Sequence, residues 1–163
     1  MAATRLYTAT QMDMKGYTGT FTLTNASNQT YWEKTAADNT SIVAIPIPKI
    51  PRTLNQDDPA ISIIAVTYSV ATTALDAAAT AVLSKHTKST TTKVWTAAAV
   101  TQTLTFAGTD TTGTAAGTFD AIVTITTPTR LADNECLELE LTFNAAVGTV
   151  LKLFGMAITH TGA

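Results

Sequence analysis

The chain of 163 residues is long enough for one domain with a buried core, and its 45% hydrophobic content excludes a disordered chain. Charged residues make up only 13%, and a net charge of −2 argues against a nucleic-acid partner, which would require clustered Lys and Arg. Threonine takes their place at roughly a fifth of the chain; it is β-branched and polar without charge. Such a surface costs little to bury against a neighbour, because a hydroxyl finds hydrogen-bond partners more readily than an ammonium group.

The elements predicted along the chain are nearly all strands. Phe21 and Leu23 share one face of an early strand, and Ile64, Val66 and Tyr68 share one face of a later strand. Between these two strands, the prolines of residues 48–59 exclude a central strand. Strands are predicted at 19–25, 41–47, 60–70, 80–88, 100–106, 119–126, 134–144 and 150–158.

The segments between these strands are assigned by composition. The alanine-rich residues 75–79 are expected to form a short helical turn before the strand at 80–88. Residues 24–38 are expected to form a polar loop, residues 95–100 a loop entering a strand, and residues 108–117 a long Gly/Thr turn.

This pattern predicts an all-β fold. About eight antiparallel strands separated by turns, without a helical period, are typical of a single-domain β-sandwich, and a jelly roll is the expected topology. The sandwich is expected over residues 19–163, with residues 1–18 forming an N-terminal arm or a first strand. We find no internal repeat and no linker long enough to separate two domains.

No catalytic, cofactor or metal site is predicted, so we expect a protein that is not an enzyme and needs no cofactor. His86 and His160 lie in Thr-rich sequence without a second ligand at metal spacing. Cys136 would need a histidine base nearby in space to act as a nucleophile, and we interpret it as a passive small residue.

The acidic residues are also given structural interpretations. Asp57 and Asp58 precede a proline and fit ordinary turn chemistry better than a cation site. Glu138 and Glu140 project from one strand face, where they are expected to keep that face solvated or to form a salt bridge with a neighbour, rather than to act as an acid–base pair.

The chain carries no recognisable targeting signal. Its first sixteen residues hold no apolar run typical of a signal peptide, and no stretch approaches the roughly 18 apolar residues of a membrane helix. The sequons at Asn25, Asn28 and Asn39 are therefore interpreted as chance matches in a Thr-rich loop. A single cysteine excludes an internal disulfide, and we expect synthesis in a cytoplasm with no membrane partner.

Several strands look apolar on both faces, which predicts burial in an oligomer. From residue 150 to 158, Lys152 is the only polar side chain, and such a strand requires dry neighbours on both sides. The strands at 41–47 and 60–70 show the same pattern. We expect the core to contain Leu139, Leu141, Leu151 and Leu153. Phe154 and Met156 are expected on the other face against a neighbouring chain, arm or loop, unless a bulge near Gly155 swaps Met156.

Three further aromatic residues are candidate contacts. Tyr31 and Trp32 lie in the expected polar loop, where a solvent-facing pair would suit sugar stacking or anchoring into another subunit, and packing in the core is as good an explanation. Trp95 permits the same alternatives. The candidate interface residues are therefore Tyr31, Trp32, Trp95, Phe154 and Met156.

The pattern of the whole chain resembles a viral family. The early strand followed by IPIPKIPR, the Thr-rich loops and the closing NECLELELTFNAAVGTVLKLFGMAI are similar to the small jelly-roll decoration, or cement, proteins of tailed bacteriophages. The resemblance covers most of residues 19–160 and implies a trimer that binds and reinforces a capsid lattice in a virion. It implies the major capsid protein or another virion protein as partner and carries over no specific functional residue.

Two classes of function therefore remain open. The first is a non-enzymatic structural assembly protein, as a capsid decoration protein or as a subunit of a phage fibre or filament. The second is a carbohydrate-binding β-sandwich, favoured by Tyr31, Trp32 and Trp95.

Overall fold

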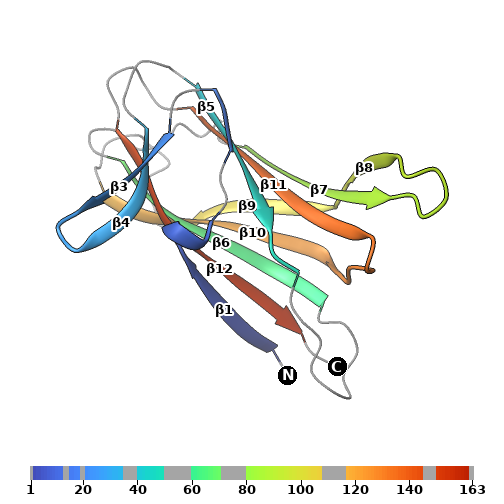
Figure 1. The fold of residues 1–163 in the computed structure, drawn as a ribbon. Coiled ribbons are helices and arrows are strands. Elements are labelled where there is room, and N and C mark those ends of the chain that lie inside the picture. The colour runs from blue at the N-terminus through green and yellow to red at the C-terminus, as the bar shows by residue number, and fades with distance from the viewer. Residues whose placement is uncertain are drawn as a thin grey trace.

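The protein is built almost entirely from β-strands (Figure 1). A computed structural model describes residues 2–12, 15–18, 21–34, 40–49, 60–70, 80–107, 117–144 and 150–161. The elements in these ranges are β1 (Ala2–Thr8), η1 (Ala9–Gln11, a short 3-10 helix), β2 (Lys15–Thr18), β3 (Phe21–Ala26), β4 (Gln29–Lys34), β5 (Thr40–Ile47), β6 (Ala60–Val70), β7 (Thr80–Lys88), β8 (Trp95–Ala99), β9 (Gln102–Ala107), β10 (Gly117–Thr129), β11 (Glu135–Asn144) and β12 (Leu151–Thr161). They form one seven-stranded and one five-stranded sheet.

The strands pair in a nested order. β4 pairs with β12, β5 with β11, β6 with β10 and β7 with β8, all antiparallel. Successive pairs alternate between the seven-stranded and the five-stranded sheet. A long antiparallel ribbon rolled up in this way is a jelly roll, so the predicted all-β sandwich is confirmed. The strands β1, β2, β3 and β9 extend the edges of the two sheets.

Alternate residues of the two sheets fill one core between them. On β11, Leu137, Leu139 and Leu141 point inward, as the alternation in the sequence predicts. The facing sheet contributes buried residues from β6, β10 and β12. The largest fully buried apolar side chains are Ile45, Ile61, Ile64, Leu83, Leu137, Leu139, Leu141, Leu151, Leu153 and Ile158.

A bulge in β12 explains why this strand looked apolar on both faces. Leu153 pairs with Tyr68 and Gly155 pairs with Thr67, so Phe154 is an extra residue on β12. The bulge moves the alternation by one residue, and Met156 therefore points into the core with 3% of its surface exposed.

The bulge corrects one expectation and leaves another confirmed. Met156 is wrong as an outward interface residue, because the bulge near Gly155, the exception that the sequence left open, turns it inward. The outward side of β12 then carries Lys152, Phe154, Ala157 and Thr159, so Phe154 is the one large apolar side chain on that side of the strand. The core positions expected for Leu139, Leu141, Leu151 and Leu153 are confirmed.

At the same bulge, β12 changes its neighbour from β4 to β1. Residues 151–153 pair with β4, and residues 155–161 pair with β1. A Cβ atom on Gly155 would lie 2.6 Å from the carbonyl oxygen of Tyr7, so glycine is required for β1 to approach this closely. The N-terminal residues thus supply β1 to one sheet, while β2 pairs with β5 in the other.

Two segments expected to be loops contain strands. Residues 29–34 form β4, and residues 95–99 form β8. Ser27 and Asn28 both have positive φ, at 54° and 61°, as the tight type I′ turn of a two-residue hairpin requires, so the apparently polar loop is a β3–β4 hairpin. The helical turn expected at 75–79, the turn at Asp57 and Asp58 and the Gly/Thr turn before β10 lie outside the described residues.

Candidate functional site

The outer surface of the seven-stranded sheet carries a broad face without charge. Two neighbouring rows of outward residues cross β1, β12, β6, β10 and β9 in register. The first row is Leu6, Ala157, Ala65, Ile122 and Thr105, and the second is Thr4, Thr159, Ile63, Thr124 and Thr103. We name these ten residues the neutral face. It spans about 20 Å across the strands, since neighbouring strands lie about 4.8 Å apart.

The neutral face combines small apolar side chains with hydroxyl groups. Leu6 at its edge is 78% exposed, whereas Ala65 and Ile122 near its centre are half-buried. The hydroxyls of Thr4 and Thr159 lie 3.0 Å apart and hydrogen-bond to each other across the β1–β12 pair. Hydroxyls that satisfy one another lose little when water is removed, so this face has a low desolvation cost.

A groove of about 620 Å³ opens beside one end of the neutral face. The tip of the β3–β4 hairpin forms one wall, and Thr8 and Thr10 form a second wall at the end of β1. The remaining lining comes from Thr67, Thr118 and the bulged Phe154. None of these lining residues belongs to the neutral face, so the two features adjoin without overlapping.

The outer surface of the five-stranded sheet differs from the neutral face, because the neighbouring strands β11 and β7 bear charged and titratable groups there. Glu138 and Glu140 project outward from β11 between the buried leucines, and His86 and Lys88 project from β7. The expectation that the glutamates lie on a partly solvated face is met, as both are only half-buried. Lys88 Nζ lies 5.9 Å from the centroid of the Trp95 ring on β8.

The register also brings Cys136 opposite His86, which the sequence could not show. His86 Nε2 lies 3.8 Å from Glu138 Oε1, beyond hydrogen-bond distance. Burial, and secondarily the charge of Glu138, raise the pKa of the Cys136 thiol. A raised pKa disfavours the thiolate, so this trio lacks the electrostatics of an activated nucleophile. The second histidine, His160, lies on β12 opposite Ala3 of β1, in a different sheet.

A metal centre is not found either. Within the part of the chain that the structure describes, no three His, Cys, Asp or Glu side chains gather in an arrangement that could hold a metal ion. In the same part, no helix is long and apolar enough to cross a membrane.

Tyr31 and Trp32 do not form a shared aromatic platform. They are consecutive residues of strand β4, so their rings point to opposite faces of the sheet. Trp32 faces inward, half-buried, and its Nε1 donates a hydrogen bond of 2.9 Å to the carbonyl oxygen of Ala9. Tyr31 is only 6% exposed, which leaves little surface for a partner. Of the alternatives that the sequence left open, the solvent-facing pair is therefore wrong, and packing within the chain agrees with the burial of both residues.

Tyr31 instead supports Phe154 from within the same chain. The two rings meet edge to face, with centroids 5.5 Å apart and an interplanar angle of 63°. Lys152 Nζ lies 4.4 Å from the centroid of the Tyr31 ring and donates a 3.3 Å hydrogen bond to its hydroxyl. That hydrogen bond is the main cause that raises the pKa of Lys152, and Glu33 lies 3.5 Å from the ammonium. The half-buried Phe154 is thus covered by β4 of its own chain.

Trp95 is the sequence-predicted contact residue that stays open to solvent. It is 54% exposed, and the neighbouring Val94 is 59% exposed. Both lie on the β7–β8 hairpin, which projects from the body of the sandwich (Figure 1). A contact role for Trp95 stays a prediction.

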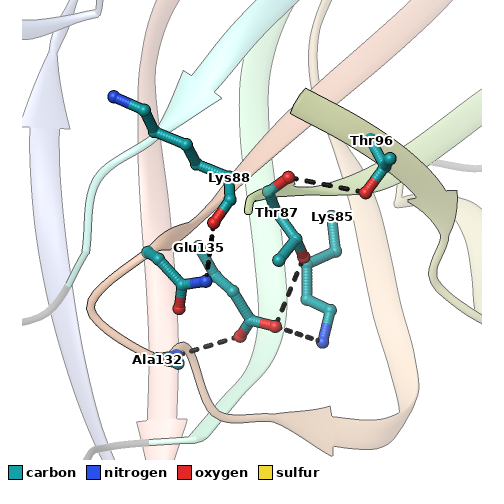
Figure 2. A network of polar contacts seen from close by, with 7 residues as sticks. Lys85, Thr87, Lys88, Thr96, Ala132 and Glu135 are labelled. Carbon is teal, nitrogen blue, oxygen red and sulfur yellow. Dashed lines mark hydrogen bonds and ion pairs between the residues drawn. The ribbon is translucent and has the colours of Figure 1, made fainter. Parts of the chain in front are cut away.

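A polar network fixes the base of this hairpin (Figure 2). Glu135 pairs with Lys85 at 2.8 Å and accepts a 2.9 Å hydrogen bond from the backbone N–H of Ala132. Asn134 Nδ2 donates to the carbonyl oxygen of Lys88 at 2.8 Å. The Lys85 ammonium, followed by the Ala132 N–H, lowers the pKa of Glu135. The network ties the turn before β11 to β7 and fulfils a structural role.

No protein-family model matches the sequence, and no curated protein or solved structure shows a significant match. The function is therefore argued from the surface of the molecule.

The neutral face is a candidate functional feature that sequence reasoning did not identify. Its members on β6, β9 and β10 stand at outward positions of predicted strands, so alternation alone could have pointed to them. Which strands lie side by side is decided by long-range pairing, as in the contact of β1 at the start of the chain with β12 at its end.

Proposed function

We propose that the protein is a non-enzymatic structural assembly subunit that associates with itself, and with a larger protein lattice, through the neutral face. The main support for this proposal is that the ten outward residues of the neutral face, on five adjacent strands, include no charged side chain. Charged residues are depleted at the cores of protein interfaces, because burying an unpaired charge is costly.

The physical character of the face favours association over permanent solvation. Threonine and alanine lose little side-chain entropy on burial, and five adjacent strands offer a continuous surface to a partner. Leu6 at the edge and Ile122 nearer the middle supply apolar area that water hydrates poorly.

Within this class, we propose a trimeric decoration protein of a viral capsid. The nested jelly-roll topology and the neutral face support this proposal, together with the resemblance of the strand pattern to bacteriophage cement proteins. The major capsid protein or another virion protein would then be the second partner. A subunit of a fibre or filament would use the same face, and particle imaging separates the two.

The decisive experiment introduces one charge into the neutral face. Thr124 is exposed on β10, so Thr124→Glu should fold normally and place a carboxylate inside the contact. Thr96 is exposed on β8, outside this face, and Thr96→Glu is the matched control. Light scattering should give a mass of three chains of 17.1 kDa for the parent and the control, and a smaller mass for Thr124→Glu.

Two results would contradict the proposal. If the parent protein remains monomeric at micromolar concentration, self-association through any face is contradicted. If the oligomer persists in Thr124→Glu but is lost in Thr96→Glu, the contact between subunits lies at the β7–β8 hairpin and not at the neutral face. Circular dichroism of all three proteins shows whether a lost oligomer reflects a lost fold.

A further inference from the structure

The groove beside the neutral face is lined by groups suited to an uncharged, hydroxyl-rich ligand. Asn28, Gln29 and Thr30 contribute amide and hydroxyl groups from the β3–β4 hairpin. Thr8 and Thr10 contribute hydroxyls from the opposite wall. Each of these side chains can both donate and accept hydrogen bonds, and among the described residues no charged side chain lines the groove.

The rest of the groove adds the hydroxyls of Thr67 and Thr118, of which the first is oriented by a hydrogen bond, and an aromatic ring. The hydroxyl of Thr67 donates a 2.6 Å hydrogen bond to Asp120 Oδ1, which leaves the oxygen lone pairs of Thr67 free to accept from a ligand. Thr118 lies on β10 beside it, and Phe154 contributes the only aromatic surface among the lining residues that the structure describes.

These groups are held in place before any ligand arrives. The bulge in β12 directs Phe154 to the groove, and the edge-to-face contact with the buried Tyr31 fixes its ring. The tight turn, with a positive φ of 61° at Asn28, fixes the backbone from which the Asn28 amide projects. The hydroxyls of Thr8 and Thr10 lie 2.9 Å apart and restrain each other. A preorganised site loses less entropy on binding.

We propose that this groove binds a neutral saccharide. Sugar hydroxyls are donors and acceptors at once, which matches threonine hydroxyls and side-chain amides. The C–H face of a sugar ring packs on the negative face of an aromatic ring such as Phe154. The groove volume of about 620 Å³ lies within the usual range of small-molecule sites.

The absence of charge in the described lining selects against anionic sugars. A carboxylated or sulfated saccharide would lose hydration without gaining an ion pair, and the Asp120 carboxylate behind Thr67 would repel it. The proposed site uses neither Trp32 nor Trp95, and it lies outside the proposed oligomer contact. Its failure therefore leaves the assembly proposal intact.

The test is an NMR titration of the full-length protein with neutral and anionic oligosaccharides. Lactose, maltotriose and di-N-acetylchitobiose are the neutral probes, and sialyllactose is the anionic probe. We expect amide shifts at residues 8–10, 28–30 and 118 with a neutral probe. Absence of any groove shift at about 10 mM of all three neutral probes, or tighter binding of sialyllactose, overturns the proposal.

Three variants separate recognition from folding. Thr118→Val removes one exposed hydroxyl, and Asn28→Gly removes the amide while glycine keeps the positive φ of the turn. Each should weaken binding about tenfold, as expected for one lost hydrogen bond. Thr126→Val, at an exposed threonine farther along β10, is the matched control and should bind like the parent. Equal affinity of the parent, Thr118→Val and Asn28→Gly would place any bound sugar elsewhere.

Discussion

The two outer faces of the sandwich differ in charge although both are built from alternating strands. On the seven-stranded sheet, the neutral face presents threonine, alanine, isoleucine and leucine across five strands, while Lys152, Glu33 and Asp120 lie outside it on the same side of the sheet. The outer face of the five-stranded sheet presents Glu138, Glu140, His86 and Lys88. Because charged groups are costly to dehydrate, the neutral face is better suited to burial against a partner than the outer face of the five-stranded sheet. For association with a partner, the positions of the few charged residues on the surface therefore matter more than their low total number.

The largest expected effect contrasts an inward with an outward position on the same strand. Leu139 is fully buried on β11, and Leu139→Ala should lower the free energy of unfolding by about 2–5 kcal/mol, because it leaves a cavity between the sheets. Glu138→Ala, one residue earlier on the half-buried outer face, should change it by less than about 0.5 kcal/mol. Urea unfolding measures both, and equal losses would contradict the assigned register.

A smaller effect is expected where β1 completes the neutral face. Gly155→Ala places a methyl group against the carbonyl oxygen of Tyr7 and should cost about 1–3 kcal/mol by displacing β1 from β12. Hydrogen exchange should then accelerate at the β1 amides while the amides of β11 stay protected. Ala157→Ser, two residues further along β12, is the control and should leave β1 protected. Unchanged exchange in Gly155→Ala would show that β1 tolerates the added methyl.

The smallest expected effect lies in the polar network of the five-stranded sheet. Glu135→Gln should cost about 1 kcal/mol at pH 7, because Lys85 is a third exposed and solvent screens the lost ion pair. The folded pKa of Glu135 is lowered from 4.5, so this contribution is complete above that value and is lost as the pH falls through the lowered pKa. The stability difference between parent and variant should therefore vanish in acid. A difference that persists at pH 2 would assign the effect to packing.

Much of the fold could be predicted because it depends on local alternation. The buried leucines of β11 and the core residues of β6 and β10 are recognisable from a period of two in the sequence. The strands β4 and β8 were missed, because polar or alanine-rich composition favours loops or turns when the pairing partner is unknown. The tight turn at Ser27 and Asn28 lacks the glycine that usually marks such a hairpin.

The candidate site could be predicted from the sequence much less well than the fold. Tyr31 and Trp32 looked like an exposed pair until the extended backbone of β4 sent them to opposite faces. Phe154 was expected on the outer side of the sheet, but its cover comes from Tyr31, well over a hundred residues earlier in the chain. The groove combines residues from near both ends of the chain and from its middle, which no local pattern relates.

The sequence by itself determined the all-β class, the inward and outward sides of most strands and the scarcity of charge, since each follows from residue type and a period of two. Only the tertiary structure decided that Met156 turns inward, because a one-residue bulge reverses the alternation after Phe154. It also decided that uncharged residues of five strands form one face and that Cys136 meets His86. Such neighbours are set by hydrogen bonding between strands that are distant in the sequence. This pairing depends on contacts throughout the folded chain, so no local pattern can predict it.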